Sequence, residues 1–112
     1  MAKKKLPSTL AAQTRLVTSG REFAEHGIVN PAVYRASTIT FPDVDTLKNR
    51  NQPYVYGRRG TPTSRALEKA VAVLEGGYDA RVTPSGLSAV STALLSYLSA
   101  GDHVLVTDAV YY

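Results

Sequence analysis

The spacing of hydrophobic residues predicts two amphipathic helices in the second half of the chain. The first has apolar residues at helical intervals that we expect to face a core, namely Leu67, Ala70, Val71 and Leu74. Thr61 suits its N-cap and Pro62 its first helical position, and Gly76-Gly77 ends it. The second helix is predicted from a similar stripe, made of Leu87, Val90, Leu94, Leu95 and Leu98. We expect this helix to end at Gly101.

Two short strands are predicted next to these helices, at residues 78–83 and 103–107. The second has apolar residues in succession from Val104 to Val106, which is typical of a strand buried on both faces of a parallel sheet. Strand, helix and strand in this order predict a βαβ unit with a right-handed crossover, and hence an α/β fold. Two strands and two helices do not cover both faces of a sheet. We therefore expect the chain to be part of a longer protein.

The first 60 residues have a weaker pattern. We expect a short helix at 14–17 ended by Gly20, a loop at 24–31, an extended piece at 38–41 and a helical turn from Pro42-Asp43 to Leu47. Residues 49–60 are polar and irregular. Because this part has little apolar stripe of its own, we interpret residues 1–60 as an arm and interface segment, and residues 61–112 as an incomplete α/β domain.

The composition is that of an ordinary globular protein, and it narrows the function mainly by exclusion. The 112 residues carry a net charge of +4, with no basic stripe interleaved with aromatic residues, so nucleic-acid binding is not predicted. The chain has no cysteine and therefore no disulfide or thiolate metal site, and we predict no metal site. Neither a membrane span of ~18 apolar residues nor a secretory signal is found, so we expect a cytoplasmic protein without membrane contact.

Three segments carry candidate chemistry, and each also has a plainer interpretation. In the turn Thr83-Pro84-Ser85-Gly86-Leu87, the free N–H groups of Gly86 and Leu87 at a helix start suit a phosphate, but Ser-Gly is also a common helix cap. In the loop 54–61, Tyr56, Arg58 and Arg59 suit a phosphate or carboxylate, although a solvated basic loop explains them too. Tyr111 follows a predicted strand, where a ring can stack on a planar ligand, or it is an ordinary core or surface tyrosine.

Several spaced motifs together resemble one family. The segments Tyr56-Gly57-Arg58-Arg59-Gly60-Thr61-Pro62-Thr63, Leu74-Glu75-Gly76-Gly77, Pro84-Ser85-Gly86 and Gly101-Asp102-His103-Val104-Leu105 resemble the pyridoxal-phosphate (PLP) enzymes of Cys and Met metabolism. Val29-Asn30-Pro31 and Arg35-Ala36-Ser37-Thr38 are similar to the early segment of that family. The resemblance implies that 61–112 begin the large PLP-binding domain of fold type I, the aspartate aminotransferase-like fold.

The resemblance also implies a role for each matching residue. Tyr56 and Arg58 match residues that reach across a dimer interface to the cofactor phosphate of the neighbouring subunit. Gly86 and Leu87 match backbone donors to the phosphate of their own subunit. Tyr111 matches the tyrosine whose ring stacks on the cofactor and assists proton transfer. The implied assembly is a homodimer or homotetramer whose active sites are shared between subunits.

Within the family, the form Gly57, Arg59, Gly60-Thr61 is similar to the branch that cleaves cystathionine by β-elimination in methionine biosynthesis, giving homocysteine, pyruvate and ammonia. Arg59 is then expected to bind a carboxylate of this small amino-acid substrate. The family's cofactor-binding lysine, and the aspartate that pairs with the ring nitrogen, lie beyond residue 112, so we expect this chain alone to be inactive. The alternatives are a γ-synthase or γ-lyase of the same family, or a non-catalytic phosphate-binding module.

Overall fold

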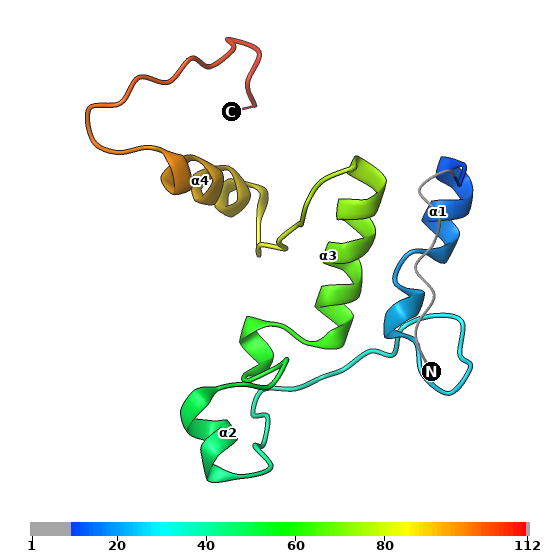
Figure 1. Ribbon diagram of the computed structural model, residues 1–112. Coiled ribbons are helices and arrows are strands. Elements are labelled where there is room, and N and C mark those ends of the chain that lie inside the picture. Colours follow the sequence, from blue (N-terminus) through cyan, green and yellow to red (C-terminus); the bar gives the residue numbers. More distant parts are fainter. Residues whose placement is uncertain (1–9, 112) are drawn as a thin grey trace. The chain divides into compact units, whose positions relative to one another are not determined.

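The computed structural model describes residues 10–111, which divide into two compact units (Figure 1). The first unit extends to Arg81 and contains α1 (Ala12–Thr18), η1 (Arg21–Phe23), α2 (Val44–Asn49), η2 (Gly57–Arg59) and α3 (Pro62–Glu75). The second begins at Val82 and contains α4 (Gly86–Tyr97). The η elements are single turns of 3-10 helix. Whether the whole protein has a domain boundary at residues 60/61 stays a prediction.

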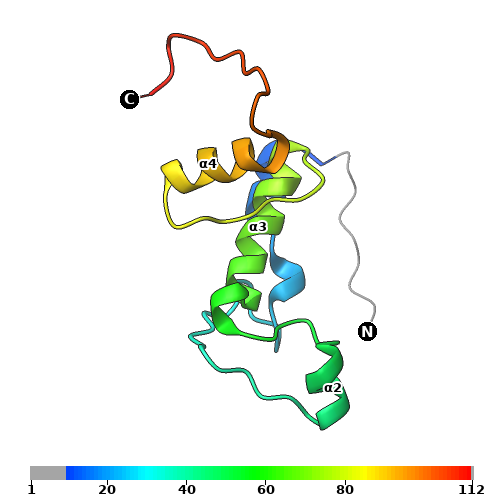
Figure 2. The same cartoon turned by 90° about the vertical axis from the view of Figure 1, so that its left-hand side faces the viewer.

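The core of the first unit lies where α1 and η1 contact α3 (Figures 1 and 2). Ala66 and Ala72 of α3 are the buried hydrophobic residues, and Gly20, which joins α1 to η1, lies against the Ala66 side chain. Arg15 of α1 donates a hydrogen bond of 3.2 Å to the Val73 carbonyl near the end of α3. The expected helix near residues 14–17 is confirmed. Small residues on both sides of this contact allow the arm to lie close to α3.

The two ends of α3 are set by local signals that the sequence displays. The Ser64 hydroxyl accepts a hydrogen bond of 3.0 Å from the Thr61 N–H and donates one of 3.1 Å to the Thr61 carbonyl. Pro62 takes the first helical position, and Gly76 ends the helix in the left-handed region at φ 67°. The predicted N-cap, first residue and terminating glycine are therefore confirmed.

The predicted apolar stripe of α3 is only partly covered in the described residues. Ala70 and Leu74 are half-buried, but Leu67 and Val71 are 54% and 41% exposed, and the buried residues are Ala66 and Ala72. The prediction is therefore wrong for Leu67 and Val71. Among the described residues the neighbours of α3 are α1 and η1, and these contact the face with the smallest side chains.

A long loop that contains α2 connects η1 to α3 (Figure 2). The Asp43 carboxylate accepts a hydrogen bond of 2.7 Å from the Thr46 N–H, so Asp43 is the N-cap of α2, close to the predicted start. The two sides of the loop meet at an antiparallel bridge between Thr38 and Tyr56. The loop therefore returns to its origin just before the turn that carries the two arginines.

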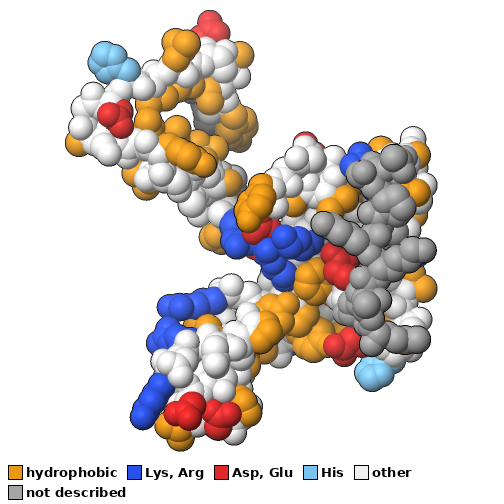
Figure 3. Space-filling model, viewed as in Figure 1, with side chains coloured by type: hydrophobic (Ala, Val, Ile, Leu, Met, Phe, Trp, Pro, Cys, Tyr) orange, Lys and Arg blue, Asp and Glu red, His pale blue; other side chains and the backbone are white. Residues whose placement is uncertain are grey.

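The second unit consists of α4 and an extended segment. Ser85 caps the start of α4, as the plainer interpretation of the Ser-Gly turn expects. The helix ends at Tyr97 and does not reach Gly101. The Asp102 carboxylate accepts a hydrogen bond of 2.7 Å from the Ser99 N–H and closes a separate turn there. The predicted stripe on α4 is mostly exposed, as the hydrophobic side chains over this part in Figure 3 show.

The described residues contain no β-strand, so the strands predicted at 78–83 and 103–107, and the βαβ unit they would form, are not found. A strand is stabilised by hydrogen bonds to a neighbouring strand, and neither segment has such a neighbour in the part of the chain that the structure describes. The apolar residues Val104 to Val106 are accordingly exposed. Within this described part, no helix is long and apolar enough to cross a membrane.

Candidate phosphate-binding site

The segment before α3 holds two arginines on one short turn. The Arg59 N–H donates to the Tyr56 carbonyl at 2.9 Å, and the Gly60 N–H donates to the Gly57 carbonyl at 3.3 Å, which closes η2. Gly60 has a φ of 137°, which residues with a side chain rarely adopt. These bonds fix the backbone from which Arg58 and Arg59 project.

The polar side chains of this turn are available to a ligand. Tyr56 is 40% exposed, and Arg58 and Arg59 are exposed as well. Among the described residues, none of the three side chains has a hydrogen bond or an ion pair. Two guanidinium groups and a phenol without protein partners are the donor set that binds a phosphate or a carboxylate.

The start of α4, in the second unit, carries the other predicted phosphate donors. The Ser85 side chain accepts a hydrogen bond of 3.1 Å from the Ser88 N–H, and the Thr83 hydroxyl donates to the Ser85 carbonyl at 3.0 Å. The N–H groups of Gly86 and Leu87 precede the first intrahelical bond and remain unpaired among the described residues. A Cβ at Gly86 would meet nothing within 4 Å, so the approach to both groups is open.

Tyr111 lies in the second unit and is 97% exposed. Its ring is therefore free to contact a ligand. The predicted site residues fall into two groups that the structure describes separately. Tyr56, Arg58 and Arg59 belong to the first unit, and Gly86, Leu87 and Tyr111 to the second.

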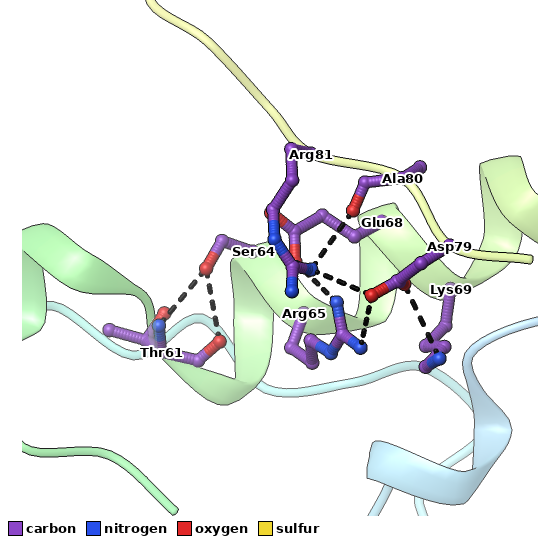
Figure 4. A network of polar contacts seen from close by, with 8 residues as sticks. All are labelled: Thr61, Ser64, Arg65, Glu68, Lys69, Asp79, Ala80 and Arg81. Carbon is purple, nitrogen blue, oxygen red and sulfur yellow. Dashed lines mark hydrogen bonds and ion pairs between the residues drawn. The ribbon is translucent and has the colours of Figure 1, made fainter. Parts of the chain in front are cut away.

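A network of ion pairs at the end of the first unit was missed by the sequence analysis (Figure 4). The Asp79 carboxylate lies 3.0 Å from the Arg65 guanidinium, 3.0 Å from Arg81 and 3.4 Å from the Lys69 ammonium. The Glu68 carboxylate lies 2.9 Å from Arg65 and 3.3 Å from Arg81. The hydrogen bond from Arg65, with further donors from the backbone and Lys69, holds the pKa of Asp79 well below its usual range.

This network fastens residues 79–81 to the side of α3. Of these ion pairs, only Arg65–Glu68 could have been found from the sequence, because its residues are spaced i, i+3 on a predicted helix. The other partners come together because Gly76 reverses the chain after α3. All of these cations already have carboxylate partners, so they are not donors comparable to Arg58 and Arg59.

No metal centre accompanies these groups in residues 10–111, where no three His, Asp or Glu side chains are placed to hold an ion. The donors available to a ligand are thus backbone N–H groups, arginines and tyrosines. Taken within its own unit, each group of donors suits an anion such as a phosphate.

Comparison with known proteins agrees with this class of ligand. Residues 13–112 match the family described as Cys/Met metabolism PLP-dependent enzyme. A putative cystathionine beta-lyase of Rhizobium johnstonii is 48% identical over 99 residues, covering 88% of this chain and 25% of that protein. Cystathionine beta-lyase of Escherichia coli is 40% identical over 117 residues, covering 99% of the chain and 28% of that protein. An L-alanine/L-glutamate racemase of Wolbachia pipientis is 40% identical over 112 residues, with 87% and 28% covered.

The chain belongs to the Cys/Met metabolism PLP-dependent enzymes, a family that implies fold type I. It spans about a quarter of the length of the curated relatives named above. The cofactor of the family is PLP, and the residues present fit it. The unpaired N–H groups of Gly86 and Leu87, with open space beside Gly86, suit its phosphate. In the first unit, Tyr56 and Arg58 have side chains without a partner among the described residues, and these are also donors that suit a phosphate.

Proposed function

We propose that the whole protein is a PLP-dependent carbon–sulfur β-lyase that cleaves cystathionine to homocysteine, pyruvate and ammonia. Two relatives whose names include cystathionine beta-lyase support the proposal, each at 40% identity or more over most of this chain. The observation that carries it is the turn Gly57–Arg59, where two arginines next to Tyr56 have no side-chain partner within residues 10–111. The same turn carries the resemblance to the β-lyase branch.

In this proposal, the residues of the chain hold the cofactor and orient it. Gly86 and Leu87 donate their N–H groups to the cofactor phosphate of their own subunit. Tyr56 and Arg58 donate to the phosphate in the neighbouring subunit, so that each site is complete only in a dimer. When bound, PLP supplies an electron sink that stabilises negative charge at the substrate α-carbon.

The remaining two residues act on the ring and on the substrate. Tyr111 stacks its ring on the cofactor, and its hydroxyl moves a proton during the reaction. Arg59 binds a carboxylate of the amino-acid substrate in the paired geometry that guanidinium groups favour. The proposed assembly is a homodimer or homotetramer in the cytoplasm, which acts on a small molecule and binds neither nucleic acid nor membrane.

A second activity is favoured by one specific finding, the similarity to an L-alanine/L-glutamate racemase. Racemisation and β-elimination both begin with removal of the α-proton, and they differ in whether a β-substituent then leaves. A phosphate grip alone does not distinguish them. Cleavage on the γ side, as in a γ-synthase or γ-lyase, is the other alternative within the family.

Product analysis of the complete gene product separates these activities. With cystathionine as substrate, we expect stoichiometric pyruvate and homocysteine. Formation of 2-oxobutyrate and cysteine instead would establish γ cleavage. Loss of optical purity of L-alanine, with cystathionine left intact, would establish a racemase. Either of these two results would contradict the β-lyase proposal.

A further inference from the structure

At Gly57 the two sides of the loop before α3 come into backbone contact. Its N–H donates a hydrogen bond of 2.7 Å to the Ser37 carbonyl, next to the bridge between Thr38 and Tyr56. We call residues 32–38 the strap. The strap and the arginine turn thus share a backbone contact directly at the first residue of η2.

This contact leaves no room for a side chain. A Cβ built on Gly57 would overlap the Ala36 carbonyl oxygen and would lie 2.5 Å from the carbonyl carbon and 3.0 Å from the Ser37 nitrogen. All three are backbone atoms, which do not turn aside as the end of a flexible side chain does. A displacement of roughly 1 to 2 Å is needed before a methyl group reaches an ordinary contact distance. Such a displacement breaks the hydrogen bond to Ser37.

The strap is fastened at its other end and so does not retreat freely. The Thr63 hydroxyl donates to the Ala32 carbonyl at 2.9 Å and accepts a hydrogen bond of 2.8 Å from the Tyr34 N–H. Thr63 stands in the first turn of α3, the helix that directly follows the arginine turn. The strap is therefore hydrogen-bonded to α3 at one end, and at the other end it contacts Gly57, the first residue of the arginine turn.

The arginine turn is also fixed at its far end. Gly60, with its left-handed φ of 137°, leads into Thr61, which is buried and hydrogen-bonded to Ser64. A turn of three residues held at both ends leaves its two arginines little freedom of backbone direction. Movement of Gly57 has to be transmitted to Arg58, the next residue.

Resting on the proposed function, we propose that Gly57 and the strap are positioning elements of the cofactor site. Gly57 allows the strap to reach the turn, and the strap sets the direction in which Arg58 and Arg59 project. Neither Gly57 nor the strap touches the cofactor in this proposal. Their effect on the phosphate is exerted through Arg58.

The test uses the complete gene product without bound cofactor and measures dissociation constants for PLP and for pyridoxal, which lacks the phosphate. Gly57→Ala is expected to weaken PLP binding about tenfold or more, the effect of losing one charge-assisted hydrogen bond. Binding of pyridoxal is expected to change less than about twofold. Gly77→Ala is the matched control, because a Cβ at Gly77 meets nothing closer than 3.7 Å and its φ is not left-handed.

A second pair of variants keeps the test decisive if Gly57→Ala does not fold. Thr63→Val removes both hydrogen bonds to the strap, whereas Thr63→Ser keeps the hydroxyl. We expect Thr63→Val, and not Thr63→Ser, to weaken PLP binding selectively over pyridoxal. Equal PLP binding by Gly57→Ala and the unaltered protein, equal losses for both ligands, or identical behaviour of the Thr63 variants would overturn the inference. Failure of the unaltered protein to bind PLP would instead contradict the proposed function on which the inference rests.

Discussion

Replacement of Arg58 by alanine separates cofactor binding from folding. The Arg58 side chain is exposed and has no hydrogen bond or ion pair among the described residues, so its removal breaks no such contact within them. The unfolding free energy of the cofactor-free protein is therefore expected to change by less than about 0.5 kcal/mol. A hydrogen bond from a guanidinium to a phosphate contributes about 1.5 to 3 kcal/mol. The lower value corresponds to roughly tenfold weaker PLP binding.

The assay is a titration of the cofactor-free complete gene product with PLP, followed by absorbance, with thermal unfolding measured in parallel. Arg21→Ala is the control, since Arg21 is likewise an exposed arginine on a single turn of 3-10 helix. The reasoning would be refuted by an unchanged dissociation constant. It would also be refuted if Arg58→Ala lowered the unfolding free energy of the cofactor-free protein by as much as it lowered the free energy of PLP binding, because Arg58 would then be a structural residue.

Three further predictions concern the ion-pair network, the helix cap and Tyr111. Asp79→Asn is expected to lower the unfolding midpoint at pH 7, because the hydrogen bond from Arg65 depresses the pKa of Asp79 in the folded state. The stabilisation by Asp79 is complete above the unfolded-state pKa of about 4 and is lost as the pH falls below it, so the midpoints of the two proteins should converge in acid. Equal midpoints at pH 7 would contradict this prediction. Ser85→Ala removes the acceptor for the Ser88 N–H and is expected to cost about 1 kcal/mol in denaturant unfolding, whereas Ser85→Thr should cost less. Tyr111→Phe keeps the ring and should bind PLP within about twofold of the unaltered protein while lowering kcat roughly 100-fold; an unchanged kcat would exclude the hydroxyl from proton transfer.

The starts of α3 and α4 and the end of α3 could be predicted from the sequence because they depend on neighbouring residues only. The capping residues Thr61 and Ser85 and the terminating Gly76 lie within four residues of the bonds they make. The end of α4 was placed too late because the competing turn, closed by Asp102 on Ser99, was not recognised. The capping residues therefore predict where these two helices begin, whereas the C-terminal end of a helix is harder to predict when another turn competes with it.

Features that depend on distant residues were not predicted. Strand formation at 103–107 needs a neighbouring strand, and burial of Leu67 needs a surface beneath it; the described residues provide neither. The close contact between Gly57 and Ala36 joins residues 21 positions apart, and no sequence pattern announces it. The candidate site residues were predicted from their motifs and remain a prediction, whereas the backbone contacts around Gly57 became visible only in the structure.

The central claim is that this chain binds the PLP phosphate with two groups of donors. One group binds the phosphate of its own subunit, and the other binds the phosphate of a neighbouring subunit. The most direct measurement is the crystal structure of the complete gene product with PLP bound. The claim predicts hydrogen bonds of about 2.7 to 3.2 Å from the Gly86 and Leu87 N–H groups to the phosphate in one subunit, and from Arg58 of the partner subunit to the same phosphate. A bound phosphate that lacks contact with the partner subunit's Arg58, or with the start of α4, would contradict the claim.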